Sequence, residues 1–465
     1  MHPTQPPPTV VIVGMGNRSS IYARESLKHP ELFRVVGVVD VRPERVRQAQ
    51  QLYRIPAEHC FSSVEELVRL PRLADAAING TMDSLHVATS LPLLRKGYDL
   101  LLEKPFATCR EEGEELVSCA RQNGRRVMIC HILRYAPFYR RLRELLQRGD
   151  IGSIINIQLT VQVSYHHQSV SFVRGRFATP DTGAAGMLLS KCSHDLDIMT
   201  WLMAGNRPVS VSSIGSLFQY RPEMAPPGAG THCLTDCPVE RECPYSARRL
   251  YLEHPQRWAN NIWHDCARAS FSAPNTPSTP NTPDIPDTPD TPDASDAPCI
   301  PSTPENISRE EKERLLRDSS NRFGRCIYRC QPQIVDHQSV LVPFADGATG
   351  TLTMNGGASA SRRHLRLTGT RGEIEGSFED ERFTVSLMDP DAPGGRRVEE
   401  IDVSGEQRGD PHGRGDEALV RDFIALLRGE ETSPCRTTLE DSLVAHRLAF
   451  LAEESRQQGG KLMLF

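Results

Sequence analysis

The chain has 465 residues, of which 38% are hydrophobic and 24% charged, a size and composition that suit two packed globular domains. Its formal net charge of −5 offers no basic field for a nucleic acid, and no apolar run approaches the roughly 20 residues that a membrane-spanning helix needs. The 13 cysteines are an odd number, and the N-terminal residues lack a signal-peptide pattern, so we expect a cytoplasmic protein without a disulfide framework.

The first 130 residues alternate short apolar runs with helical patterns. This rhythm predicts a Rossmann domain, a doubly wound parallel sheet that binds ligands at the carboxyl ends of its strands. The expected strands are residues 10–13, 34–39, 76–80, 99–102 and 127–130. The expected helices are residues 20–27, 44–53, 64–70, 87–96 and 110–123.

Beyond residue 150 the apolar residues alternate over longer stretches, which predicts a large, mainly antiparallel sheet with one buried face. These stretches are residues 154–164, 209–220, 338–355 and 365–387, and helices are expected at 186–203, 416–428 and 439–456. We therefore expect an α/β chain with a Rossmann domain over 1–130 and a C-terminal α+β domain over 131–465. The second domain is predicted to bind substrate and to form a homodimer or homotetramer through its sheet.

A repeat of Pro, Thr and Asp occupies residues 270–305. It has almost no apolar side chains to offset the entropy of ordering, so we expect a disordered insertion without a catalytic role.

A glycine-rich motif follows the first expected strand. Gly14 permits a tight turn, Gly16 lets a pyrophosphate approach the backbone, and the next helix offers its N-terminal amides to the anion. An ordinary glycine turn has the same short pattern, but the position between a strand and a helix favours a dinucleotide site. The motif reads Gly14-Met15-Gly16-Asn17-Arg18-Ser19.

Asp40 ends the second expected strand, where a carboxylate accepts hydrogen bonds from the ribose hydroxyls and repels a 2′-phosphate. It favours NAD over NADP. Arg42 keeps NADP open as the weaker alternative, because an arginine there can neutralise a phosphate. The alternative for Arg42 itself is an ordinary solvated side chain. Thr81 and His86 follow the strand at 76–80 and are expected to face the dinucleotide, although His86 is equally typical of a helix N-terminus without a ligand.

The segment Glu103-Lys104-Pro105 ends the strand at 99–102. Together with the glycine motif, Asp40 and His86, it resembles the family of glucose-fructose oxidoreductase, inositol dehydrogenase and MocA (Gfo/Idh/MocA). The resemblance covers nearly the whole chain and implies an NAD(P)-dependent oxidoreductase. Further motifs in the same order are Arg134-Tyr135-Ala136-Pro137, Gly149-Asp150-Ile151-Gly152 and Ser193-His194-Asp195-Leu196-Asp197.

In that family the lysine of the EKP segment lies beside the nicotinamide, and a histidine from the second domain completes the site. Removing a hydride from carbon requires a base for the hydroxyl proton and a nearby positive group. The resemblance therefore implies that His194 is the general base and that Lys104 orients the substrate, with exchanged roles as an alternative. Glu103 and Lys104 also count among the expected cofactor contacts. A salt-bridged Lys104 and a core-lining His194 are the structural alternatives.

Five further residues are expected to contact the substrate. Asp197 lies three residues after His194 on the same helical face, where it binds a hydroxyl or orients the imidazole. Relatives often carry an aspartate four residues before this histidine, but Ser190 stands there, so the neighbouring Lys191 becomes a substitute contact or a surface lysine.

The remaining three of these residues lie in two expected loops. The polar stretch 165–176 offers His166 and Arg174 as contacts to sugar hydroxyls or a carboxylate, with plain solvation as the alternative. His412 lies in a segment that resembles the HGGGD stretch of some family branches near the substrate pocket, although its glycines also suit a turn.

Cysteines cluster on both sides of the Pro/Thr/Asp repeat, as Cys233-x3-Cys237-x5-Cys243 and Cys326-x3-Cys330. Paired thiolates can hold a structural zinc, and we assign Cys233, Cys237, Cys243 and Cys330 to it. Reduced buried cysteines are the alternative, because the spacing is not that of a standard zinc finger. No catalytic metal is expected.

These features together predict transfer of a hydride between a nicotinamide cofactor and a hydroxyl or carbonyl of a sugar, sugar derivative or cyclitol. One alternative is an NAD-dependent glycosidase that oxidises its substrate transiently and eliminates the aglycone. The other is a dinucleotide-sensing protein without catalysis.

Overall fold

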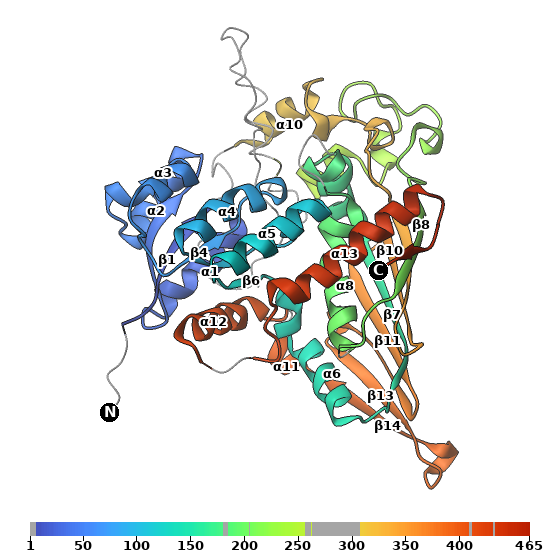
Figure 1. The fold of residues 1–465 in the computed structure, drawn as a ribbon. Coiled ribbons are helices and arrows are strands. Elements are labelled where there is room, and N and C mark those ends of the chain that lie inside the picture. Colours follow the sequence, from blue (N-terminus) through green and yellow to red (C-terminus); the bar gives the residue numbers. More distant parts are fainter. Residues whose placement is uncertain are drawn as a thin grey trace.

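The computed structural model describes residues 6–179, 185–203, 205–255, 262, 307–408, 412–430 and 433–465. The repeat expected to be disordered at 270–305 lies outside these residues. Two sheets dominate the described part, a parallel one near the N-terminus and a larger one whose strands lie between residues 154 and 464 (Figure 1).

The N-terminal sheet has six strands in the order β3-β2-β1-β4-β5-β6, and all neighbours are parallel. The order reverses between β1 and β4, which creates the crevice where doubly wound sheets bind ligands. This confirms the predicted Rossmann arrangement. The strands are β1 (Thr9–Val13), β2 (Arg34–Val39), β3 (Cys60–Phe61), β4 (Ala76–Asn79), β5 (Asp99–Leu102) and β6 (Val127–Ile129).

Five helices connect these strands, each within three residues of its predicted bounds at either end. They are α1 (Asn17–Lys28), α2 (Pro43–Tyr53), α3 (Val64–Arg69), α4 (His86–Lys96) and α5 (Arg110–Gln122). Strand β3 has only two residues and was not predicted, because so short a run carries no periodic signal.

The second sheet has nine strands in the order β14-β13-β12-β11-β7-β10-β9-β8-β15. Only the central pair of β7 and β10 is parallel, so the sheet is mainly antiparallel, as predicted. Its strands are β7 (Ile154–Ser164), β8 (Ser210–Ser216), β9 (His337–Pro343), β10 (Thr349–Ala358), β11 (Arg362–Gly369), β12 (Gly372–Ser377), β13 (Arg382–Met388), β14 (Arg396–Asp402) and β15 (Met463–Leu464).

One face of this sheet packs on helices, and these helices also lie between the sheet and the Rossmann domain (Figure 1). Along β7 every second residue from Ile157 to Val163 is buried, which is the alternation expected of a half-buried strand. The buried side chains join one core with those of the covering helices. The helices on the sheet are α6 (Pro137–Arg148), α8 (Met187–Leu202) and α13 (Leu439–Gln457), whereas α12 (Gly415–Arg428) packs against α1 and the turn at Ile132–Tyr135.

Helix α6 was not among the predicted elements, although its boundary motifs were noticed. Pro137 occupies its first turn, where a missing N–H costs nothing, and Gly149 ends it with a φ of 75°. The predicted stretch 338–355 resolves into two strands joined by a turn at Gly347, whose φ is 95°. Likewise, the stretch 365–387 resolves into most of β11, all of β12 and most of β13.

A lobe at the top of Figure 1, formed by residues 217–255 and 307–336, contains little regular structure. Its longest helix in the described part is α10 (Arg309–Arg317), and the rest consists of turns and short 3-10 or π turns. Two small hydrophobic clusters form its interior.

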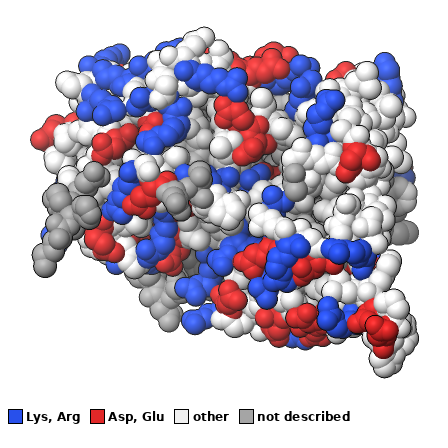
Figure 2. Space-filling view, turned by 60° about the horizontal axis from the view of Figure 1, so that its bottom comes forward, with Lys and Arg blue, Asp and Glu red and all other residues white. Residues whose placement is uncertain are grey.

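Basic and acidic side chains are intermixed on the face drawn in Figure 2. That face shows no extended field of one sign. Among the described residues, none of the helices combines the length and apolar character needed to cross a bilayer.

Candidate active site

A cleft opens where the Rossmann sheet meets helix α8 and the loop before α12. Its empty volume is about 710 Å³, including the part open to solvent, which is within the usual range for small-molecule sites. It is lined by Arg18, Gly80, Thr81, Asp83, His86, Glu103, Lys104, Pro105, Cys130, Ile132, Leu133, Phe177, Ser190, Lys191, His194, Arg363 and His412.

The glycine motif forms the turn between β1 and α1. Gly14 has a φ of 78°, and a Cβ at this position would lie 2.9 Å from the Cα of Thr81, so only glycine fits without displacing backbone. Gly16 is the N-cap of α1 and no side chain caps this helix. The N-terminal amides of α1 therefore keep the polarity that suits an anion such as a pyrophosphate.

Asp40 lies just beyond β2 and braces the same turn. Its carboxylate accepts hydrogen bonds from the backbone N–H groups of Met15 (2.7 Å) and Arg42 (2.8 Å), and only 6% of the residue is exposed. Arg45, which sequence reasoning did not single out, lies 3.6 Å from this carboxylate. Burial lowers the pKa of Arg45 to about 10, and the charge of Asp40 opposes that effect.

Arg18 is buried in a network of charges rather than directed into open solvent. Its Nε donates to Glu103 over 3.0 Å, its Nη2 donates to Asp416, and its guanidinium packs on the ring of Tyr22. Arg18 was predicted to contact the cofactor. The structure gives it the further role of linking the Rossmann domain to α12.

The remaining residues predicted for the dinucleotide lie close to this turn. Asn17 begins α1, and Ser19 is buried one turn into it, with no hydrogen-bond partner for its Oγ among the described residues. His86 is buried, and its ring nitrogens face the carbonyl oxygens of Pro105 (2.7 Å) and Thr81 (2.9 Å). His86 therefore holds together the two loops that follow β4 and β5.

Lys104 and His194 line the same cleft from the two domains. The Nζ of Lys104 donates to the carbonyl oxygen of Ser190 on α8 over 3.4 Å. His194 is buried, and the Nδ1 of its ring has no hydrogen-bond partner among the described residues. Burial, and then the positive charge of Lys104, lowers the pKa of His194 well below its ordinary value. Its imidazole is therefore neutral at physiological pH and can accept a proton.

His131 stands behind His194, edge-on, with ring centroids 5.5 Å apart. Its Nε2 lies 2.8 Å from the Oγ of Ser442, and burial lowers its pKa well below the ordinary value. Sequence reasoning missed His131. The available signal was its position two residues after β6, at the carboxyl edge of the parallel sheet.

Arg363 reaches the cleft from strand β11 and was also missed. Its Nε donates to the carboxylate of Asp195 over 3.0 Å, and its charge is one of the factors that keep His194 neutral. An arginine in an alternating strand gives no sign of which neighbouring element it meets.

The structure corrects the prediction that Asp197 contacts the substrate. Asp197 is completely buried, and Arg134 donates two hydrogen bonds to its carboxylate, at 2.7 and 2.6 Å. It does not line the cleft. Because one carboxylate oxygen lies 3.8 Å from the Nδ1 of His131, Asp197 acts on the site only through that histidine.

Arg174 and His166 also lie outside the cleft, contrary to prediction. Arg174 is fully buried beside the cysteine cluster. The ring of His166 is tilted against that of Tyr165, with centroids 4.1 Å apart, and burial lowers the pKa of His166.

Lys191 and His412 line the cleft. The Nδ1 of His412 lies 3.2 Å from the carboxylate of Asp416 and 3.4 Å from Arg18. Burial opposes ionisation of Asp416, but the charges of Arg18 and His412 prevail and hold its pKa well below the usual range.

Comparison with known protein families identifies the family of this chain. Residues 9–131 match an oxidoreductase family model described as an NAD-binding Rossmann fold, and residues 139–234 match the GFO/IDH/MocA C-terminal domain. The chain belongs to the Gfo/Idh/MocA family of oxidoreductases. The family resemblance inferred from the spaced motifs is thereby confirmed.

Individual relatives of this Gfo/Idh/MocA protein are distant. YteT of Bacillus subtilis is 24% identical over 249 residues, which is 51% of this chain and 57% of that protein. The 1,5-anhydro-D-fructose reductase of Ensifer adhaerens is 33% identical over 144 residues, 30% of this chain and 41% of the reductase. The matched region thus spans about half the length of these relatives.

Likeness to solved structures extends over the whole fold. The WlbA dehydrogenase of Chromobacterium violaceum, solved with NADH and UDP-GlcNAcA, has a TM-score of 0.61 and 14% sequence identity. The alignment covers 99% of this chain and 97% of that one. At this identity the likeness establishes the shared fold.

Proposed function

We propose that this Gfo/Idh/MocA protein is an NAD-dependent dehydrogenase that oxidises a hydroxyl group, or reduces the corresponding carbonyl, of a sugar, sugar derivative or cyclitol. The observation that carries the proposal is the pairing of Lys104 and His194 in one cleft, directly beside the glycine-rich edge of the Rossmann sheet. A cation and a neutral imidazole are the two groups that alcohol oxidation requires.

The residues present fit a bound dinucleotide. The Gly14 turn leaves no room for a side chain, and the uncapped start of α1 at Gly16 suits a pyrophosphate. Asp40 adds a buried negative charge at the end of β2, which favours NAD over NADP, with Arg42 as its neighbour. When bound, the nicotinamide supplies the hydride acceptor or donor.

The chain's own side chains would then hold and move a proton. His194 takes the proton from the substrate hydroxyl, which its neutral state permits, while Lys104 stabilises the negative charge that develops on that oxygen. Burial, and then the positive charges of Lys104 and Arg363, keep the imidazole neutral between turnovers. In the alternative, Lys104 takes the proton and His194 stabilises the negative charge. Mutation of each residue distinguishes the two assignments.

The substrate class rests on the polar character of the cleft and on the relatives. Lys191, Ser190 and His412 supply hydrogen-bonding groups around the catalytic pair, which suits a ligand with several hydroxyls. The name of one relative, 1,5-anhydro-D-fructose reductase, describes action on a sugar derivative.

The test is to incubate the purified chain with NAD and a panel of sugars, inositols and glycosides while following reduced-nicotinamide absorbance. Formation of NADH with one polyol class supports the proposal. Release of an aglycone without net NADH would indicate the glycosidase alternative instead. Dinucleotide binding with neither product across the panel would favour a sensing role.

Two predictions about organisation remain proposals. We divide the chain into a cofactor domain over 1–130 and a substrate domain over 131–465. We also propose that the outward face of the large sheet, where Leu341 and Ile214 are exposed, joins subunits into a homodimer or homotetramer. Light scattering of wild type and of Leu341→Glu measures the subunit number, which the substitution is expected to reduce.

A further inference from the structure

The irregular lobe brings two distant cysteine-bearing segments together. The backbone N–H of Cys233 donates to the carbonyl of Gly324 over 2.9 Å, and the N–H of Cys326 donates to the carbonyl of Thr231 over 2.8 Å. This short antiparallel pairing fixes Cys233 and Cys326 beside each other. The chain between the two segments includes the whole Pro/Thr/Asp repeat.

Four cysteines line one small pocket in this lobe, namely Cys233, Cys237, Cys243 and Cys326. The fifth, Cys330, is not part of the lining, and its Sγ instead lies 3.3 Å from the carbonyl oxygen of Cys326. Four thiols from two chain segments around one pocket match the ligand number of a tetrahedral structural metal site.

A buried cation beside the pocket lacks an acidic partner. Arg174 is 1% exposed, and its guanidinium donates to the carbonyl oxygens of Arg325 (2.9 Å) and Tyr245 (2.9 Å). It also donates to the hydroxyl of Tyr251 and lies 3.5 Å from the Sγ of Cys233. Among the described residues no carboxylate pairs with Arg174. Burying an uncompensated cation is costly, so this position calls for a nearby negative charge.

Thiolates bound to a metal would supply that charge. A divalent ion held by four thiolates leaves a net charge of −2 at the pocket, next to the guanidinium.

We propose that Cys233, Cys237, Cys243 and Cys326 hold one structural zinc ion, with Arg174 balancing the charge of the thiolates. This assignment replaces Cys330, which the sequence spacing had suggested, with Cys326. The zinc would fasten the two ends of the inserted segment to each other in a lobe that has little regular structure of its own. It has no part in hydride transfer, so it is independent of the proposed function.

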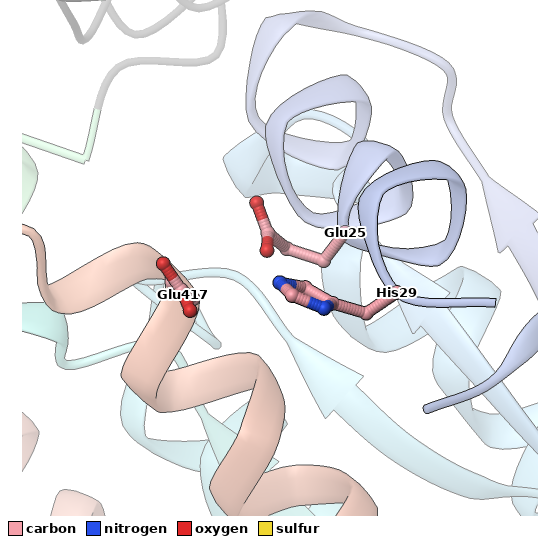
Figure 3. Close-up of side chains that lie close together, drawn as sticks. All are labelled: Glu25, His29 and Glu417. Atoms are coloured by element: carbon pink, nitrogen blue, oxygen red, sulfur yellow. The ribbon is translucent and has the colours of Figure 1, made fainter. Parts of the chain in front are cut away.

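The Sγ atoms must turn toward the pocket centre for the ion to bind. Among the described residues, the only group of three metal-ligating atoms within 4.8 Å of one another is Glu25, His29 and Glu417. Figure 3 shows these side chains directed toward one another from α1 and α12. Each already has an ionic partner, since Glu25 pairs with Lys28, His29 with Glu31 and Glu417 with Arg421, so this group carries no metal proposal.

The test begins with elemental analysis of the full-length protein, purified without chelator and under reducing conditions. About one zinc per chain is expected for wild type. Cys326→Ser and Cys243→Ser should lose most of the zinc. Cys330→Ser is the matched control, since it removes a thiol four residues from Cys326 but outside the pocket, and it should keep wild-type zinc.

Absence of zinc from wild type, or iron in its place, would overturn the proposal. So would loss of zinc in Cys330→Ser together with retention in Cys326→Ser. If the Cys326 variant does not fold, wild type grown with cobalt still decides, because four thiolates around Co²⁺ give intense sulfur-to-metal charge-transfer absorption. A wild-type protein that takes up cobalt without that absorption would also contradict the ligand set.

Discussion

The imidazole of His194 is held in its neutral form by its surroundings. It is buried, it faces Lys104, and Arg363 lies near enough to oppose a second positive charge. A base must be unprotonated before it can accept a proton. The positive groups beside His194, which suit an anionic or polar ligand, also keep its imidazole unprotonated.

We expect Lys104→Ala and His194→Ala to reduce turnover about 100-fold or more while NAD affinity stays near wild type, because Gly14, Gly16 and Asp40 hold the dinucleotide. Steady-state kinetics and calorimetric titration with NAD measure the two effects. Ser190→Ala is the control with a mild effect. Near-normal turnover of His194→Ala with a verified substrate would place the base elsewhere, with Lys104 and His412 as the next candidates.

Asp40 is expected to set the preference between the two dinucleotides. Asp40→Ala removes the buried charge that repels a 2′-phosphate, so the affinity for NADP should rise relative to NAD by about tenfold or more. Binding of NAD itself should also weaken, because Met15 loses the acceptor that braces the glycine turn. Calorimetry with both dinucleotides gives the ratio. Tight NADP binding by wild type would show that Arg42 dominates instead.

The predicted residues that share the cleft all belong to linear motifs. Lys104, His194, Lys191 and His412 all reach one cleft, and each was found in a segment with a recognisable order of residues. Arg363 was not predictable, because its role depends on which strand lies beside α8. Asp197 was misassigned for the opposite reason, since helical spacing gives its face but does not reveal a buried arginine opposite it.

Helix α12 connects the domains through its first turn. Asp416 pairs with Arg18 of α1 and with His412, and Arg18 in turn holds Glu103 of the EKP segment. A change at the start of α12 is therefore transmitted to the loop that carries Lys104.

Asp416→Asn should destabilise the protein by roughly 2 kcal/mol, because it removes one of the two carboxylates that pair with buried Arg18. The value is below that for a fully buried pair, since the Asp416 side chain is 19% exposed. Glu417→Gln is the matched control on the next residue, whose exposed pairing with Arg421 should contribute well under 1 kcal/mol. Denaturant unfolding measures both. Equal effects of the two substitutions would argue against a connecting role.

Periodicity predicts most of the helices and strands, but it does not predict which of them lie side by side in the fold. The apolar run at 34–39 and the alternating stretch at 154–164 coincide with β2 and β7. Helix α6 was missed although Phe138, Leu142 and Leu145 have helical spacing and form its buried face. Alternation shows which face of a strand is buried, whereas strand order depends on contacts between distant segments.

Three buried histidines make the molecule as a whole sensitive to acid. His131, His194 and His446 all have a pKa lowered mainly by burial, to about 3 in the case of His446. In the unfolded chain each takes up a proton near pH 6.5, whereas the folded protein resists protonation. The unfolded state therefore binds more protons below pH 6.5, and stability must fall as the pH decreases.

Each histidine is expected to contribute about 1.4 kcal/mol per pH unit below 6.5 to this loss. The free energy of unfolding at pH 7, 6 and 5 measures the sum before most carboxylates titrate. His446→Gln should reduce the slope by about a third, because that ring accepts the N–H of Phe106 without needing a charge. A flat profile over this range would contradict the assignment of neutral histidines.

The single parallel pair in the large sheet has a consequence for the order in which the chain assembles. Strand β7 pairs only with β10 and β11, and Asn156 meets Thr349 across 193 residues of sequence. During synthesis, the Rossmann domain can fold while both edges of β7 are still unpaired. An unpaired apolar strand is a template for intermolecular association. A chain ending before residue 349 should therefore aggregate, even though its cofactor domain is complete.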